Sequence, residues 1–396
     1  VMESKGVSSV TAELKSKHPT ARVLAVGGTN CAAPDAAATW LADYILCIAK
    51  DARRWVPHSV AGHALPAAVL SALPASWKIA RGPGLSAAVE GWRLGQQDRI
   101  VTRMAVDALK HVHPTLTYVD FPEFGAVAPY VPPAQQGGTF RGLLRGIDSG
   151  IASIIATLRK QGSVKGTSFV VTSGEAVSPA DQSVPKSALV SGIVAAGGQQ
   201  VYIDGSGLAT IGLQDVLQAQ PVAQAIEGQH RNPIDALYFR NGSGSAMSYS
   251  PEYLNPLLPR RYTDSIAYLL STLVSSIAPH VVVAYAPHTM TGTAPLQHHA
   301  RFSSIGGAAW DTQHIPLVLS GHGIVSGISA YPARLVDVAP TVEALLGLGH
   351  PSGPGVVLAD ALSQSSQGDI DAQTRAQRTL SPIVSALRAR VTGSGQ

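Results

Sequence analysis

The sequence predicts an α/β protein: a three-layer α/β/α sandwich with a mostly parallel central sheet and a small inserted α+β cap. Short apolar segments alternate along the chain with longer segments of helical periodicity. Such alternation is typical of a parallel sheet covered by helices on both faces. Near the middle of the chain the order changes to strand, strand, helix, strand, which indicates a separate small subdomain.

The individual elements follow from these patterns. The first strand, 21–27, is an apolar run that ends at a glycine turn. The clearest helix is 141–160, whose apolar face consists of Leu143, Leu144, Ile147, Ile151, Ile154, Ile155 and Leu158. The other predicted strands are 116–120, 167–173, 200–204, 209–213, 235–240, 281–285 and 315–320. The other predicted helices are 34–50, 65–73, 216–227, 262–277 and 337–346.

The domain organisation follows from the position of the middle block. We expect a core in two parts, 1–184 and 261–362, that is interrupted by a cap over 185–260. The last segment, 363–396, is polar with arginine-rich helical character, and we expect a C-terminal helical tail there.

Composition narrows the choice of partners. Charged residues make up only 14% of the chain, and 39 glycines with many alanines and serines fill the difference. A weakly charged surface of small residues favours association with copies of the same chain or with other proteins. The net charge is +4, but the basic residues are scattered, so no nucleic-acid surface is predicted. No apolar run approaches the roughly 20 residues of a transmembrane helix.

The two cysteines, Cys31 and Cys47, form no zinc or redox motif. One bridge between them is possible, although the sequence does not give their separation. The chain starts at Val1 rather than at methionine, which we interpret as processing or trimming.

Three segments in a fixed order carry a family resemblance. The first joins Gly142–Asp148 to the strand Thr167–Ser173, the second is Trp310–Gly321, and the third is Arg334–Thr341 with the Leu-Leu-Gly that ends at Gly347. Together they resemble the alkaline phosphatase superfamily, and most closely its type I phosphodiesterase/nucleotide pyrophosphatase branch, which is related to sulfatases. The resemblance covers roughly residues 20 to 350.

The resemblance implies a pair of zinc ions and a threonine or serine nucleophile, with carboxylates and imidazoles as ligands. At all but one of the corresponding positions this chain has residues without suitable side chains. The nucleophile position is Gly62, and the ligand positions are Gly27, Gly125, Pro129, Gly174, Glu175 and Ile305. Only Glu175 could bind a cation, so we expect no metal cofactor and a lost metal site. His314, in the second segment, is expected to have a structural, hydrogen-bonding role.

These substitutions predict a catalytically inactive homologue, a pseudoenzyme, that serves a structural, assembly or binding role. The expected partner is another copy of the same chain or a protein assembly. One alternative is an active phosphoric ester hydrolase with relocated ligands, drawn from Glu175, Asp120, Glu123, His298 and His299. Another is a binding module that holds a small anion in the emptied pocket. The family resemblance favours an extracellular or cell-envelope location.

Overall fold

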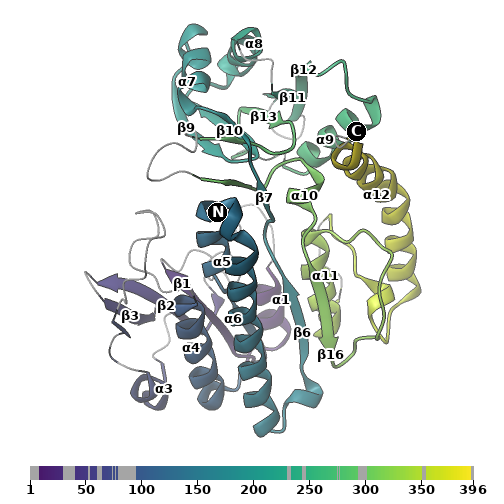
Figure 1. Cartoon of the computed structure of the whole chain (residues 1–396). Coiled ribbons are helices and arrows are strands. Elements are labelled where there is room, and N and C mark those ends of the chain that lie inside the picture. Colours follow the sequence, from purple (N-terminus) through teal and green to yellow (C-terminus); the bar gives the residue numbers. More distant parts are fainter. Residues whose placement is uncertain are drawn as a thin grey trace. The chain divides into compact units, whose positions relative to one another are not determined.

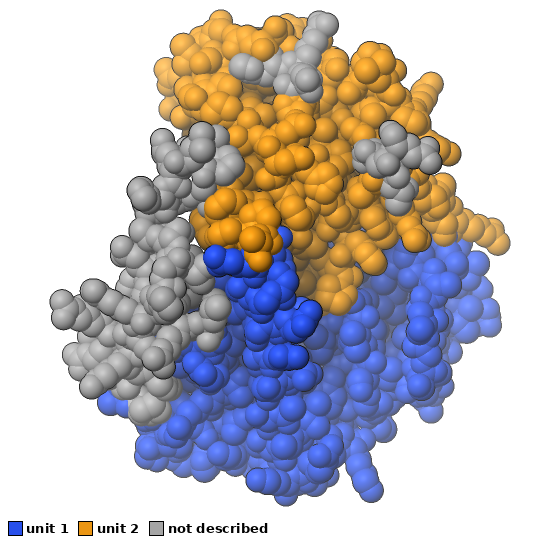
Figure 2. Space-filling model, in the orientation of Figure 1, with its two compact units in different colours: residues 1–127, 135–171, 317–377 blue, residues 128–134, 172–316, 378–396 orange. Residues whose placement is uncertain are grey.

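Two five-stranded sheets organise the chain in a computed structural model (Figure 1). The structure describes residues 9–29, 41–51, 54–59, 65–73, 75, 77–78, 95–229, 233–242, 247–273, 275, 277–292, 301–349 and 354–393. Each sheet lies in its own unit, and Figure 2 colours the two units separately. The first unit comprises Val1–Val127, Gln135–Val171 and Leu317–Gln377, and the second comprises Ala128–Ala134, Thr172–Pro316 and Arg378–Gln396.

Among its described strands, the sheet of the first unit is mixed, with two parallel and two antiparallel strand pairs. Strand β1 (Val23–Thr29) pairs in parallel with β2 (Tyr44–Asp51) on one side and with β5 (Leu116–Val119) on the other. Beyond β2, strands β3 (Arg54–Ser59) and β4 (Trp77–Lys78) continue the sheet in antiparallel pairs. The carboxyl ends of β1 and β5 therefore point to the same edge of the sheet.

Helices cover both faces of this sheet. Leu24 and Val26 of β1 pack against α3 (Ala67–Ala72), α4 (Gln96–Val112) and α6 (Pro133–Lys160). The intervening residues, Val23 and Ala25, pack on the other face against α1 (Val10–Lys17). Because side chains alternate along a strand, each residue of β1 contributes to one of two cores. The result is a three-layer arrangement within this unit.

The remaining elements of the first unit are shorter, apart from α12. Strands β6 (Ser168–Thr172) and β16 (Leu317–Gly321) pair with each other. The other elements are α5 (Glu123–Val127), η5 (Val164–Gly166), η8 (Leu335–Asp337), α11 (Val338–Leu345), η9 (Ala359–Ala361) and the first part of α12 (Gln367–Gly393).

The sheet of the second unit is antiparallel, in the order β12-β11-β13-β10-β9. Its strands are β9 (Gln200–Gly205), β10 (Leu208–Leu213), β11 (Ile234–Asn241), β12 (Ser248–Leu254) and β13 (Val281–Tyr285). Gly205 allows the tight β9–β10 turn, since its φ is +123° and a Cβ there would lie 1.8 Å from the Leu208 carbonyl oxygen.

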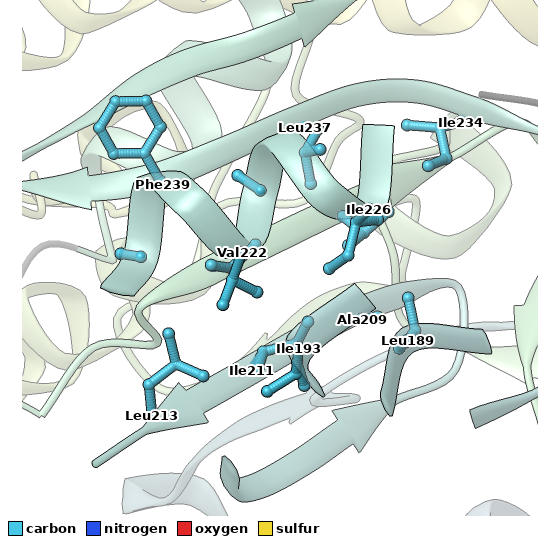
Figure 3. Close-up of a cluster of buried hydrophobic side chains, with 14 of the residues drawn as sticks. Leu189, Ile193, Ala209, Ile211, Leu213, Val222, Ile226, Ile234, Leu237 and Phe239 are labelled. Carbon is cyan, nitrogen blue, oxygen red and sulfur yellow. The ribbon is translucent and has the colours of Figure 1, made fainter. Parts of the chain in front are cut away.

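This second sheet is also covered on both faces. On one face, Leu237 and Phe239 of β11 pack with Val222 and Ile226 of α8 (Ala219–Gln229) (Figure 3). Helix α7 (Lys186–Ala195) completes that layer. The opposite face packs against α9 (Arg260–Ser271) and the second part of α12. The other elements are η4 (Ala128–Tyr130), η6 (Val216–Gln218), β7 (Val177–Pro179), β8 (Gln182–Val184), β14 (Thr289–Thr291), β15 (Ser303–Ile305) and α10 (Trp310–Gln313).

The predicted α/β class is confirmed, as are the strand at 21–27, the 200–213 hairpin and the strand at 281–285. The helix predicted over 34–50 is wrong where the structure describes it, because β2 begins at Tyr44. Leu46 and Ile48 pack on one face of the sheet while Ile45 packs on the other. A strand buried on both faces is apolar throughout, and its sequence does not distinguish it from a buried helix.

The predicted cap, 185–260, lies within the second unit and includes β9 to β12. The sheet of that unit also contains β13, which follows the cap in the sequence. Among the residues that the structure describes, no helix is both long enough and apolar enough to cross a membrane. Cys47 is disulfide-bonded, and Cys31 lies outside the described residues.

Candidate functional site

The carboxyl end of β1 carries two buried glycines where the family resemblance expects a carboxylate. Gly27 is the predicted vacancy, and Gly28 follows it. At Gly28 a Cβ would lie 2.3 Å from the Cγ of Pro122, so only glycine fits beside that ring. The strand end is therefore packed closely against the segment that follows β5.

Asp120 follows β5 at the same edge of the sheet, and its N–H donates to the Val26 carbonyl at 2.9 Å. Burial raises the pKa of the Asp120 carboxyl, and a hydrogen bond from the Gly28 backbone N–H opposes that rise. The Gly28 N–H is therefore already paired with a carboxyl group of the chain.

The side chain of Glu123 caps the start of helix α4, which precedes it in the sequence. Its side chain is fully buried, and it accepts hydrogen bonds from the backbone N–H groups of Gly95, Gln97 (3.1 Å) and Asp98 (3.4 Å). These N–H groups form the N-terminus of α4, whose N-cap residue, Gly95, has no side chain to cap them. A carboxylate distant in sequence thus supplies the cap and complements the helix dipole. Burial is the largest influence on Glu123 and raises its pKa, against the N–H bonds.

Asp98 completes this arrangement, because its Oδ1 accepts the backbone N–H of Glu123 at 3.3 Å. Its Oδ2 is buried and has no hydrogen-bond partner. Burial, reinforced by the charge of Glu123 and then by that of Asp120, raises the pKa of Asp98 to about 7. The sequence interpretation missed Asp98; the only signal for it was an acidic residue in the first turn of a helix that starts after glycine.

Two predicted positions of the first unit differ in what surrounds them. Gly27 is buried at the end of β1, whereas Gly125 is exposed in α5, and a Cβ at position 125 would have no atom within 4 Å. Packing therefore does not require glycine at position 125.

In the second unit, the structure brings Glu175 and Ile305 together. Strand β15 pairs with β7 so that Ile305 lies opposite Val177, and the Gly306 N–H donates to the Ala176 carbonyl at 3.1 Å. A Cβ on Gly306 would lie 3.5 Å from Oε2 of Glu175, which places this exposed carboxylate beside the end of β15.

Pro129 and Gly174 belong to the same unit. Pro129 is buried, and its carbonyl accepts the Phe302 N–H at 2.7 Å, next to β15. Gly174 lies in the exposed turn before Glu175, and a Cβ there would have no atom within 4 Å. Gly62, His298 and His299 lie outside the described residues.

The second unit also contains a cluster of polar side chains, Ser178, His288 and Asp311, that the sequence did not predict. The Ser178 hydroxyl donates to Asp311, and the His288 Nδ1 lies 3.0 Å from the Pro179 carbonyl and 4.0 Å from the Asp311 carboxylate. A catalytic triad needs histidine between serine and aspartate. Here Ser178 bonds directly to Asp311, and Ser178 is only 1% exposed. The cluster is therefore not arranged as a triad. Its contacts connect β7, α10 and the turn before β14.

His314 stacks on Trp310 with ring centroids 4.6 Å apart. This contact is ring stacking, and the hydrogen-bonding role expected for His314 stays a prediction.

The fold described above is similar to the folds of two solved structures, and the predicted resemblance is confirmed at the level of the fold. Human ectonucleotide pyrophosphatase/phosphodiesterase 5 aligns with a TM-score of 0.52 and 10% identity, over 89% of this chain and 75% of its own. Wild-type alkaline phosphatase PafA aligns with a TM-score of 0.57 and 12% identity, over 89% of this chain and 77% of its own. At such identities the likeness concerns the fold alone.

No protein-family model matches this sequence, and no curated protein matches it significantly. The residues of this chain must therefore be judged by their own chemistry.

The zinc pair implied by the resemblance does not fit the residues present. Gly27, Gly125, Pro129, Gly174 and Ile305 have no side-chain oxygen, nitrogen or sulfur atom that could coordinate a metal. Within the described part of the chain, no three or more His, Cys, Asp or Glu side chains are grouped so that they could hold a metal ion. The carboxylate of Glu123 instead accepts backbone N–H groups.

Proposed function

We propose that this chain is a catalytically inactive protein on an alkaline phosphatase superfamily fold, with a structural, assembly or binding role. The observation that carries the proposal is the donor set at the strand ends. The expected ligand positions are glycine, proline and isoleucine, apart from Glu175, and the buried carboxylate of Glu123 is engaged as a helix cap. A two-metal phosphoryl-transfer site requires several free carboxylates and imidazoles.

A turnover assay tests inactivity directly. The purified full chain is incubated with zinc and with aryl phosphate mono- and diesters, and release of the aryl alcohol is followed. We expect no release above that of a mock preparation. Glu175→Gln is the matched variant, because Glu175 is the only acidic residue at a ligand position. Chelator-sensitive turnover that Glu175→Gln abolishes would refute the proposal and favour relocated ligands.

The alternative of an anion site in the emptied pocket has less support. An anion at the end of β1 would need free backbone N–H groups. The Gly28 N–H is paired with Asp120, and Asp98 and Glu123 add acidic groups in the same unit. This edge of the sheet therefore disfavours an anion electrostatically.

Composition supports an assembly role. Only 14% of the residues are charged, and many glycines, alanines and serines take their place, so the surface is weakly charged. Light scattering across a concentration series tests self-association of the full chain. A dimer or larger species is expected, and a monomer at the highest concentration would remove the assembly role without affecting the proposed inactivity.

The disulfide at Cys47 supports an extracellular or cell-envelope location, because disulfides persist mainly in oxidising compartments. Thiol alkylation of protein taken directly from its native source tests this location. We expect no alkylated Cys47 without a reductant, and full alkylation would place the protein in a reducing compartment.

A further inference from the structure

A groove in the second unit lies between the β11–β12 pair and helix α9. Its volume is about 420 Å³, within the range of small-molecule sites. A β-bulge lies beside it: Leu237 pairs with Tyr253, but the next residue, Tyr238, pairs with Pro251, which leaves Glu252 as the extra residue. Bulges of this kind bend a strand and redirect its side chains.

Much of the wall of the groove is apolar, and its two tyrosines are fixed in position. Tyr238 and Tyr249 line it together with Pro251, Leu254 and Leu258. The Tyr238 hydroxyl donates to the Thr263 carbonyl at 3.2 Å, and the Tyr249 hydroxyl donates to the Pro279 carbonyl at 2.8 Å. Because both phenols are tied to backbone carbonyls, the two rings are held in place before any ligand arrives.

The rim carries one charge of each sign. Arg260 and Asp264 line the groove from α9, one helical turn apart, and their side chains are 93% and 66% exposed. The Arg260 Nε lies 3.8 Å from the Asp264 Oδ2, beyond hydrogen-bond distance, so Arg260 can donate to a closer acceptor and Asp264 can accept from a closer donor. An apolar groove with adjacent positive and negative groups is complementary to a ligand with the opposite arrangement.

We propose that this groove binds a small zwitterion with an apolar side chain, of the class of free α-amino acids such as phenylalanine or leucine. The ligand carboxylate pairs with Arg260, and its ammonium group pairs with Asp264. Its side chain lies against Tyr249, Pro251 and Leu254, since Tyr238 is buried beneath the groove. The proposal does not depend on the proposed inactivity, since none of these residues lies at a predicted metal position. For so small a ligand we expect a Kd on the order of 1 mM.

Calorimetric titration of the full chain with phenylalanine tests the site. N-acetylphenylalanine lacks the cation, phenylalanine amide lacks the anion, and glycine lacks the apolar body. Each is expected to bind at least about tenfold more weakly than phenylalanine, because charged hydrogen bonds and apolar burial contribute separately.

Four variants locate the binding. Ala267→Trp fills the groove from an exposed position of α9, and Ala152→Trp places the same ring on an exposed position of α6. Ala267→Trp should weaken binding at least about tenfold, whereas Ala152→Trp should leave it unchanged. Arg260→Gln should remove the preference for phenylalanine over its amide, and Asp264→Asn should remove the preference over the N-acetyl form.

All four positions are exposed, so circular dichroism should show an unchanged fold. No binding of phenylalanine at millimolar concentration would overturn the proposal. Binding that Ala267→Trp leaves intact would overturn it as well, because the ligand would then lie elsewhere.

Discussion

At the scale of single residues, Glu123 and Asp98 connect the segment that follows β5 to the start of α4. The Glu123 carboxylate accepts N–H groups of α4, and the Asp98 carboxyl accepts the N–H of Glu123. Each acidic group thus bonds the backbone of the other's segment. Such reciprocal caps stabilise a helix start.

Removing the cap should destabilise the fold. Glu123→Ala leaves buried N–H groups of α4 without an acceptor, and we expect the free energy of unfolding to fall by about 2 kcal/mol. Urea denaturation measures the change. Glu175→Ala, in an exposed turn, is the control and should stay within about 0.5 kcal/mol of the parent. Equal effects of the two variants would contradict the assigned cap.

Asp98 should make stability depend on pH. Burial raises its pKa from 3.8 to about 7 in the folded protein, so the folded state binds more protons than the unfolded state between these values. The free energy of unfolding therefore falls as pH rises through this window, by at most about 1.4 kcal/mol per pH unit. Glu123, whose pKa is also raised, contributes in the same direction.

Asp98→Asn removes this titration while it keeps an acceptor for the Glu123 N–H. We expect the variant to gain stability relative to the parent as pH rises from about 4 to about 7, which denaturation at several pH values would measure. Asp148→Asn, on an exposed position of α6, is the control. Parallel pH profiles for Asp98→Asn and the parent would show that Asp98 titrates normally.

At the scale of elements, α6 illustrates how far a periodic pattern can be trusted. The sequence predicts a helix over 141–160, and the observed helix is Pro133–Lys160. Leu143 is buried and Leu158 packs on the core, but Leu144 is 55% exposed. The two leucines are adjacent, about 100° apart on the helix, so one side of the predicted apolar face turns outward. The periodicity predicts the helix, but it does not predict how wide the buried face of the helix is.

Two glycines of α6 should respond oppositely to alanine. At Gly146 a Cβ would have no atom within 4 Å, so Gly146→Ala should stabilise the protein by about 0.5–1 kcal/mol through helix propensity. At Gly150 a Cβ would lie 2.6 Å from the Thr102 Oγ1 and 3.0 Å from the Phe121 ring. Gly150→Ala should therefore destabilise the protein by about 1–3 kcal/mol. Thermal unfolding compares them, and a shift of the same sign for both would contradict the packing around Gly150.

At the scale of the whole molecule, the α/β class and most of its strands could be predicted, because apolar runs and helical periodicity are local properties. Strand pairing could not. Val281–Tyr285 is buried on both faces, so nothing in its sequence reports that it pairs antiparallel with β10 and β11.

The candidate site also has one part that the sequence predicts and one part that it does not. The vacancies expected at Gly27 and Ile305 follow from residue identity and the family resemblance, and they stay predictions. The roles of Asp98, Ser178 and Asp311 depend on contacts between segments far apart in the sequence, such as the 133 residues that separate Ser178 from Asp311. No local pattern contains such contacts.

Metal binding tests the central proposal, an emptied catalytic site, most directly. The full chain is dialysed against zinc and then against metal-free buffer, and its zinc content is determined by mass spectrometry. Because the expected ligand positions other than Glu175 lack donor atoms, we predict zinc well below one ion per chain, with no change in Glu175→Gln. Retention of a full pair of zinc ions per chain would contradict this account.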